Sequence, residues 1–195
     1  MNMAHIKAFK GISYNPDKIT DYKKVVTPPY DVISREMQED FYKLNPHNII
    51  RLILGKEMAN DTARNNKYTR ARLFLNTWLK EKVLTQEKKP CIYIYRQIYL
   101  HDSKKRVRTG FLALMKIEDP HRSSVLPHEY TLAKPRADRL NLIKQAKSNL
   151  SPIFSLYYEK DCFISKVLKD SIKKSNSMAS IDFEGVTHQL WRVSD

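Results

Sequence analysis

The sequence predicts an α+β fold: a mixed, mainly antiparallel sheet with hairpins and three to four packing helices. Two observations indicate this class. Segments with helical spacing of apolar residues are interspersed with β-rich runs bounded by turn residues. These segments do not alternate regularly, as they do in a doubly wound α/β fold. An apolar fraction of 42% and only 4 glycines in 195 residues favour a packed core over a disordered or fibrous chain.

The first third of the chain is expected to contain two strands and one helix. Residues 6–14 are predicted to form a short strand that ends at the turn residues Asn15-Pro16-Asp17. Ser34 is placed to cap a helix that runs to about Leu44. The almost wholly apolar run 48–54 is predicted to be a buried strand that ends at Gly55.

The middle of the chain is expected to form a long helix and then a hairpin. A helix is predicted after Asp61, because apolar residues recur there at spacings of three and four. Residues 91–100 and 107–117 have β-rich composition, and residues 101–104 between them suit a turn. The helix presents one apolar face: Tyr68, Ala71, Leu75, Trp78, Leu79 and Val83.

The last third is expected to hold two helices, a strand and a second hairpin. Pro135 suits the first position of a helix that runs to about Lys147. Residues 153–158 are predicted to form a strand, and Asp161 is placed to cap the helix that follows. Glu184-Gly185 is typical of a hairpin turn between two short strands.

The chain carries a large surplus of positive charge. With 35 Lys and Arg against 21 Asp and Glu, the net charge is +14. Such a surplus attracts nucleic acid, nucleotides, phosphorylated metabolites or an anionic membrane. A solvated lysine-rich surface is the alternative, because most of the basic residues are scattered. The densest clusters are Lys104-Lys105-Arg106 with Arg108, Lys88-Lys89, and Lys173-Lys174.

Several function classes lack their signatures in this sequence. There is no glycine-rich phosphate loop, GxSxG, HExxH or CxxC motif, and no metal site is predicted. No apolar run approaches the roughly 20 residues that span a bilayer, and the N-terminal residues lack a secretory apolar region. Two isolated cysteines, Cys91 and Cys162, suit a reducing compartment. We therefore expect a cytoplasmic protein, either one α+β domain over 1–195 or the N-terminal part of a longer one.

The segment expected to handle a ligand runs from Leu126 to Leu156, and Val125 to Arg139 is chemically the densest stretch. His128 titrates near neutrality and lies beside the carboxylate of Glu129, a pairing that suits acid–base catalysis. A hydroxyl and three cations follow at the predicted helix start, where amide groups and positive charge favour phosphate. A polar loop with a capped helix remains the alternative, in which Asp138 offsets the helix dipole. The residues expected to bind phosphate or substrate here are Thr131, Lys134, Arg136 and Arg139.

Other polar residues are weaker candidates for the same site. A proline-stiffened loop presents Tyr30 and Asp31, whose alternative role is a rigid connector with an Asx turn. Arg51 is either an anion ligand or a partner in a buried ion pair. Asn149 and Ser151 are either ligands or members of a simple turn.

Six ordered motifs together resemble the uncharacterised family called domain of unknown function 1015. The similarity covers essentially the whole chain and raises the expectation that the TPPYD, LPHE and NLSP segments are functional. The motifs are FKGISYNP, VVTPPYDVIS, NPHNIIRLILGK, LPHEYTLAKPRADRL, SNLSPIFSLY and HQLWRVSD.

This resemblance implies chemistry that lies largely outside the present sequence. Members of the family are longer and continue, after the segment like His188 to Asp195, into an Asp-Gly-His-His-Arg run. That run is similar to a signature of free-serine kinases with the chromosome-partitioning-protein/sulfiredoxin-like fold. By analogy the resemblance implies a small-molecule phosphotransferase that binds nucleotide with Mg²⁺, with serine as an acceptor. His128 or Glu129 would then act on the acceptor hydroxyl, and Asp31 would contact a metal ion or a substrate amine.

Because the Asp-Gly-His-His-Arg run is missing here, the chain is expected to be a truncated product, a fragment whose other half is separately encoded, or a form with only a binding role. Three functions stay open: part of a kinase-like phosphotransferase, a nucleic-acid-binding protein, as the net charge favours, or a catalytically inactive remnant.

Overall fold

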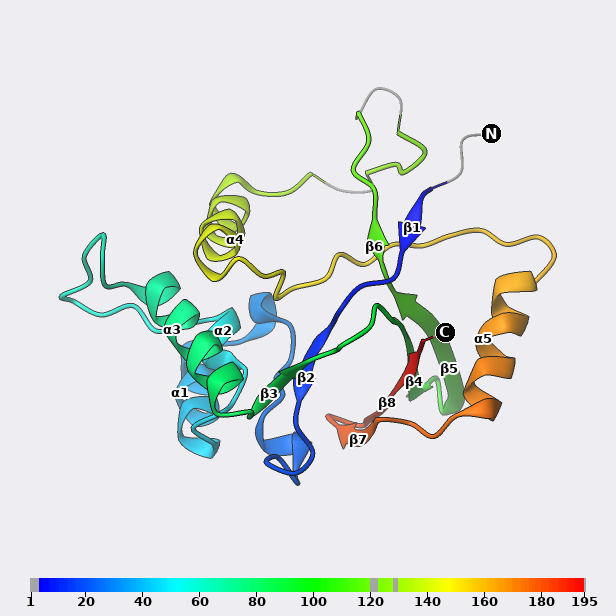
Figure 1. The fold of residues 1–195 in the computed structure, drawn as a ribbon, viewed down its shortest axis with the longest axis horizontal. Coiled ribbons are helices and arrows are strands. Elements are labelled where there is room, and N and C mark those ends of the chain that lie inside the picture. Colours follow the sequence, from blue (N-terminus) through cyan, green and yellow to red (C-terminus); the bar gives the residue numbers. More distant parts are fainter. Residues whose placement is uncertain (1–3, 120–122, 128–129, 195) are drawn as a thin grey trace. The chain divides into compact units, whose positions relative to one another are not determined.

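The computed structural model describes residues 4–119, 123–127 and 130–194. These residues contain five α-helices and eight short or medium strands, and every strand pairing is antiparallel (Figure 1). The predicted α+β class is therefore confirmed. None of the helices in the described residues is long and apolar enough to cross a membrane.

The chain divides into two compact units, each assembled from separate stretches of sequence. Unit 1 contains the described residues of 1–11, 87–128 and 154–195. Unit 2 contains the described residues of 12–86 and 129–153.

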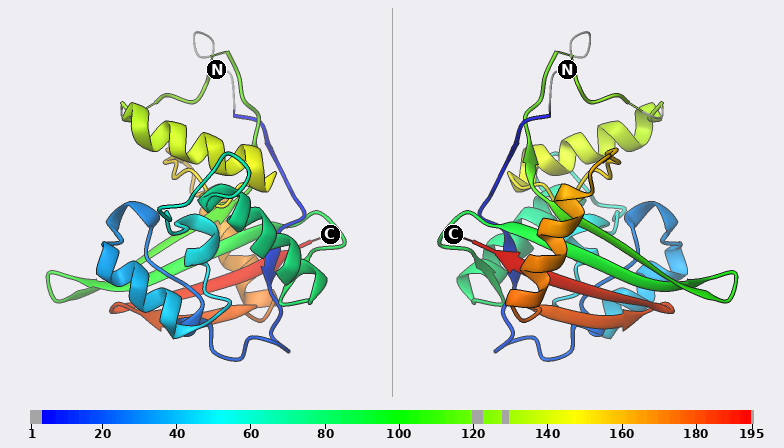
Figure 2. Two further views of the ribbon diagram at one scale, coloured as in Figure 1. Left: turned by 90° about the vertical axis from the view of Figure 1, so that its left-hand side faces the viewer. Right: turned by 90° about the vertical axis from the view of Figure 1, so that its right-hand side faces the viewer.

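Unit 1 is built on a four-stranded antiparallel sheet with the strand order β5-β4-β8-β7. Helix α5 (Phe163–Lys174) packs on one face of this sheet (Figure 2), and the buried residues there are Ile94, Leu168 and Trp191. The sheet strands are β4 (Ile92–His101), β5 (Lys104–Leu112), β7 (Ala179–Phe183) and β8 (Val186–Val193), and a separate short pair joins β1 (Ile6–Lys7) to β6 (Leu114–Met115).

Both predicted hairpins are present in unit 1. Asp102 and Ser103 connect β4 to β5 with φ angles of 50° and 59°. Glu184 and Gly185 connect β7 to β8 with φ angles of 49° and 76°. Two successive left-handed residues match the twist of antiparallel strands, and this conformation favours residues such as Asp102 and Gly185.

Unit 2 is mainly helical. Its core contains the buried residues Ile19, Val25, Leu52, Ile53, Leu75, Trp78, Val83, Leu84 and Ala146. Helix α4 packs against α3, and α2 packs against both α1 and α3. The elements are β2 (Ile12–Tyr14), η1 (Tyr22–Lys24), η2 (Tyr30–Val32), α1 (Arg35–Leu44), α2 (Ile50–Ile53), α3 (Lys67–Lys80), β3 (Leu84–Gln86) and α4 (Ala133–Ala146).

The predicted buried strand at 48–54 is wrong, because this run contains the short helix α2. Asn48 is fully buried, and its side-chain oxygen accepts a hydrogen bond from the amide of Ile50 at 2.9 Å. Its side-chain nitrogen donates to the carbonyl of Lys24 at 2.8 Å. These bonds set a local turn that favours helix, and a short apolar run cannot by itself distinguish buried helix from buried strand.

The predicted strand at 153–158 is also absent, since the segment is extended but belongs to no sheet. The expected single strand at 6–14 is instead two short strands, β1 and β2.

Helix α4 begins at Ala133, so Pro135 is its third residue rather than its first. The capping of α1 by Ser34 is confirmed, because its hydroxyl accepts from the amide of Met37 at 3.2 Å.

Helix α5 is capped by a residue other than the predicted Asp161. The carboxylate of Glu159 accepts hydrogen bonds from the amides of Ile164 and Ser165 and from the Ser165 hydroxyl. A longer side chain further upstream therefore satisfies the first-turn donors, because the chain turns through a left-handed residue at Cys162.

Candidate functional site

The start of helix α4 is uncapped and basic. Its N-cap is Leu132, which supplies no side-chain hydrogen bond, and its first turn contains no acidic residue. Pro135 has no amide proton, so the donors at this helix start are the amides of Ala133 and Lys134. Unsatisfied amides and the helix dipole both favour an anion at such a position.

The sequence-predicted residues around this helix start are exposed. Thr131, Lys134 and Arg136 all face solvent, and their side chains make no hydrogen bond or ion pair within the described residues. His128 and Glu129 lie outside the described residues. Two of the predicted cations, Lys134 and Arg136, therefore remain available to a ligand in this structure.

Arg139 lies one turn further along the same helix and is held on two sides. Its Nη2 and Nε groups donate to the carboxylate of Asp138 at 2.5 and 3.1 Å. Its guanidinium lies 3.9 Å from the ring centroid of Tyr30 in a cation–π contact. Its Nη1 atom is buried and has no hydrogen-bond partner among the described residues. A buried donor without a partner is uncommon, and an oriented guanidinium is suited to an anionic ligand.

Asp138 joins this helix to the first turn of α3. Its Oδ1 atom accepts from Lys67 Nζ at 2.7 Å and from the Tyr68 hydroxyl at 2.8 Å. Burial by itself would raise the pKa of Asp138, but hydrogen bonds from Lys67, Arg139 and Tyr68 outweigh burial and lower its pKa to about 2. The carboxylate is thus ionised at neutral pH and orients three donors.

Lys67 has a second carboxylate partner, Glu57, at 2.8 Å. Burial would lower the pKa of Lys67, yet its hydrogen bonds to Asp138 and Glu57 raise its pKa above the ordinary value. Asn66 positions this lysine by capping α3, because its side-chain oxygen accepts from the amides of Tyr68 and Thr69.

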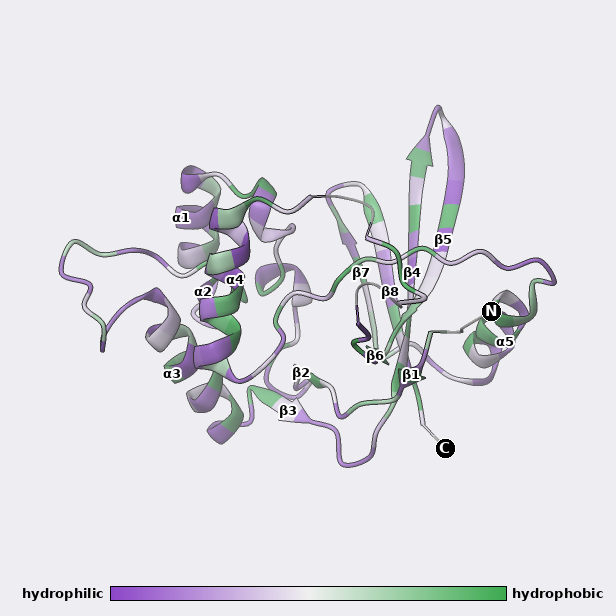
Figure 3. Cartoon of the chain, turned by 90° about the horizontal axis from the view of Figure 1, so that it is seen from above, coloured by the Kyte–Doolittle hydropathy of each residue, from purple (hydrophilic) through white to green (hydrophobic). Residues whose placement is uncertain are grey.

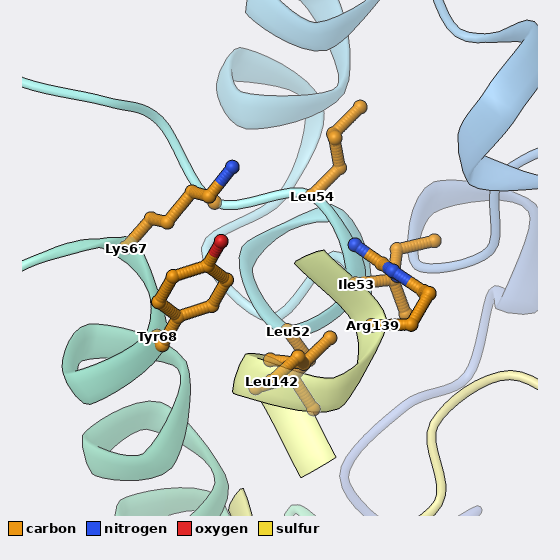
Figure 4. Close-up of a pocket in the computed structure, with 8 residues that line it drawn as sticks. Leu52, Ile53, Leu54, Lys67, Tyr68, Arg139 and Leu142 are labelled. Carbon is orange, nitrogen blue, oxygen red and sulfur yellow. The ribbon is translucent and has the colours of Figure 1, made fainter. Parts of the chain in front are cut away.

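A small cavity lies between these residues (Figure 4). Its volume is about 10 Å³, which is room for about one water molecule or one ligand oxygen. The lining comes from the end of α2, the start of α3 and the middle of α4. The residues are Leu52, Ile53, Leu54, Gly55, Lys67, Tyr68, Arg139 and Leu142.

An open hollow of about 390 Å³ shares part of this lining. That volume falls within the range of small-molecule sites in proteins. Lys67, Leu54 and Gly55 line both spaces. Gly55 allows the two chain segments to approach closely, because a Cβ atom there would lie 3.1 Å from the carbonyl oxygen of Lys67. The remaining lining is mixed in charge: Arg35, Gln38, Glu39, Lys56 and Glu57.

Of the other residues predicted from the sequence, some contact this cluster and others do not. Tyr30 contacts Arg139, whereas the neighbouring Asp31 is exposed in η2. The guanidinium of Arg51 packs over Tyr42 at 4.3 Å, and its Nη1 atom is buried without a described partner. Asn149 accepts from the amide of Ser151 at 3.3 Å, which matches the turn role weighed for this pair.

Lys67, Tyr68 and Glu57 are members of the cluster that the sequence reasoning missed. Tyr68 was expected only as part of an apolar helix face, and Asp138 only as a dipole-offsetting charge. No local pattern could identify them, because Tyr68 and Asp138 are 70 positions apart in sequence. The described residues contain no group of three or more acidic, histidine or cysteine side chains that could hold a metal ion.

Architecture and site together define a basic α+β protein with an oriented arginine–lysine–carboxylate cluster. The chain belongs to the family described as Protein of unknown function (DUF1015), whose model matches residues 6–195. No curated protein and no solved structure matches the chain.

Proposed function

We propose that unit 2 binds the phosphate of a nucleotide or phosphorylated small molecule and serves as part of a kinase-like phosphotransferase. The observation that carries the proposal is Arg139, whose guanidinium is oriented by Asp138 and Tyr30 yet keeps Nη1 without a partner. An arginine that is already oriented loses less side-chain entropy when it binds phosphate.

Two further features support a phosphate ligand. Arg136 lies three residues before Arg139, so the two cations are neighbours on the surface of α4. The amides at the uncapped helix start add donors, and the adjoining hollow has space for the rest of a small ligand.

The transfer step would move a phosphoryl group from a nucleotide to a hydroxyl of a small acceptor. The bond from phosphorus to the leaving nucleotide oxygen breaks, a bond to the acceptor oxygen forms, and the hydroxyl proton passes to a base. Such reactions depend mainly on positioning and charge stabilisation, which Lys134, Arg136 and Arg139 would supply. Of the predicted acid–base pair, Glu129 belongs to unit 2 and would take the proton, and Asp31 would contact the acceptor amine or a metal ion.

Magnesium is compatible with this site in the mode typical of nucleotides. Mg²⁺ commonly uses one or two carboxylates together with the substrate phosphates. Glu57 is an exposed carboxylate on the lining of the hollow and suits that role. When bound, the ion would neutralise phosphate charge.

The proposal is tested by titration calorimetry, in which a nucleoside triphosphate with Mg²⁺ is added to the full chain and to an Arg139→Lys variant. Lysine keeps the charge but loses the planar guanidinium, so we expect binding at least about tenfold weaker. Arg72→Lys is the matched control, because Arg72 is exposed on α3 and lines neither the small cavity nor the open hollow.

Absence of nucleotide binding, or equal loss in the two variants, would contradict the proposal. Binding without phosphate transfer to any small hydroxyl compound would restrict the chain to the binding part of the enzyme.

A further inference from the structure

The edge strand of the unit 1 sheet is strongly basic. Strand β5 ends the strand order β5-β4-β8-β7, so one side of it has no strand neighbour. Figure 3 shows that the β4–β5 hairpin projects from the sheet and that the hydrophilic residues of β5 lie toward its tip. Asp102 is the one carboxylate in the sequence from 92 to 112. The cations near the tip of β5 are all exposed: Lys104, Lys105, Arg106 and Arg108.

Three of these cations share one face of the strand. Lys104, Arg106 and Arg108 alternate with residues of the opposite face, so they form a row with about 7 Å between neighbours. Successive phosphates along a nucleic-acid strand have a similar spacing. Gly110 continues the row, and a Cβ atom there would meet nothing within 4 Å, so the surface stays open beyond Arg108.

A segment with three exposed aromatic side chains contacts this basic strand through two of them. Phe154, Tyr157 and Tyr158 have exposed fractions of 59%, 47% and 91%. The guanidinium of Arg108 lies 5.3 Å from the ring centroid of Phe154. The ring centroids of Phe111 in β5 and Tyr157 are 6.0 Å apart. Phe154 therefore contacts the face of β5 that carries the basic row, and Tyr157 contacts Phe111 on the opposite face.

We propose that this basic–aromatic surface of unit 1 binds single-stranded nucleic acid. Proteins that bind single strands without sequence preference combine cations that follow the backbone with aromatic rings on which bases stack. Lys104, Arg106 and Arg108 would contact phosphates, and Phe154 and Tyr158 would stack on bases. Lysines on an edge strand also discourage strand pairing, but that role does not account for exposed aromatic rings beside them.

This function is separate from the phosphotransferase function proposed for unit 2. The surface uses only residues of unit 1, whereas the Arg139 cluster uses only residues of unit 2. Each proposal can therefore fail without the other.

The test is fluorescence anisotropy of the full chain with labelled oligothymidylate and oligouridylate at several salt concentrations. The triple variant Lys104→Ala, Arg106→Ala, Arg108→Ala should bind at least about tenfold more weakly. For this variant, the slope of log K against the logarithm of the salt concentration should be smaller in magnitude by about 2. The reason is that each phosphate contact with a single strand contributes about 0.7 to that slope. The matched control removes three exposed lysines of α5: Lys166, Lys169 and Lys173.

Stacking is tested by a second pair of exposed substitutions. Tyr158→Ala should weaken binding about fivefold or more, which corresponds to at least 1 kcal/mol for a base–aromatic contact. Leu156→Ala removes a similarly exposed side chain that cannot stack and should have little effect.

Three results would overturn the proposal. The first is no anisotropy change at low salt, and the second is an equal loss of affinity in the β5 and α5 triple variants. The third is binding to phosphatidylserine vesicles with no binding to oligonucleotides, which would assign the surface to a membrane.

Discussion

At the scale of single residues, Asp138 connects three side chains of the cluster: Lys67, Tyr68 and Arg139. Its carboxylate receives hydrogen bonds from α3 and from the neighbouring Arg139, and its side chain is only 18% exposed. Removing one member of such a buried network leaves the remaining charges without partners. Asp138 thus contributes both to the stability of unit 2 and to the orientation of Arg139, the residue proposed to bind phosphate.

Asp138 should make the stability of the protein depend on acid pH. Its pKa of about 2 in the folded protein is below the ordinary value of 3.8, so the unfolded chain takes up this proton first. The stabilisation, up to about 2 kcal/mol, is therefore present above pH of about 4 and is lost as the pH falls toward 2. Urea unfolding from pH 7 downward measures it, with Asp138→Asn as the comparison.

The difference in unfolding free energy between wild type and Asp138→Asn should shrink as the pH falls. Other carboxylates, such as Asp61 beside Arg70, also have lowered pKa values, so only the difference isolates Asp138. A difference that stays constant between pH 7 and pH 2 would refute this assignment.

At the scale of helices and strands, capping decides where several elements begin. Helix α5 starts after a left-handed residue, and Glu159 supplies the acceptors for its first turn. Glu159→Ala should therefore lower the urea midpoint of unfolding, because the first-turn amides of α5 lose their acceptor. Urea denaturation monitored by circular dichroism measures this midpoint.

Asp161→Ala is the control for this helix start. Asp161 is the residue that the sequence favoured as the cap, but its side chain makes no hydrogen bond or ion pair in the described structure. Its removal should change stability by less than about 0.5 kcal/mol. If Asp161→Ala proved the more damaging substitution, the capping by Glu159 would be wrong.

Local sequence signals predicted those elements whose cause is local. The turns at Asp102-Ser103 and Glu184-Gly185 and the cap at Ser34 depend on residues within a few positions of one another. The helix at Ile50–Ile53 depends instead on Asn48, whose side chain bonds the carbonyl of Lys24, 24 positions away. The apolar run around it carries no sign of that contact.

In the candidate site, too, residues with a local sequence signal were predicted and contacts between distant residues were not. Lys134, Arg136 and Arg139 were predicted because they gather at one helix start, and Tyr30 because its loop is stiffened by proline. Their relation to Lys67 and Tyr68 arises from the packing of α3 against α4, which no spacing in the sequence expresses. Family resemblance likewise could not supply it, because the family has no established activity.

At the scale of the whole molecule, cations occur in two arrangements of different character. In unit 2, cations are ordered by carboxylates around a small cavity, as expected for recognition of one anionic group. In unit 1, cations form an exposed row without carboxylate partners, as expected for a long polyanion. The two arrangements predict different ligands and different responses to salt.

The most direct measurement of the central claim is nuclear magnetic resonance mapping of nucleotide binding on the isotope-labelled full chain. A non-hydrolysable nucleoside triphosphate with Mg²⁺ should change the chemical shifts of the Ala133, Lys134 and Arg136 backbone amides and of the Arg139 Nε–H group. These changes should reach saturation as the nucleotide concentration rises. Exposed lysines elsewhere, such as Lys166 and Lys169 of α5, should remain unchanged. Shifts spread over all basic surfaces, or confined to residues outside α4 and the adjoining hollow, would contradict the phosphate site.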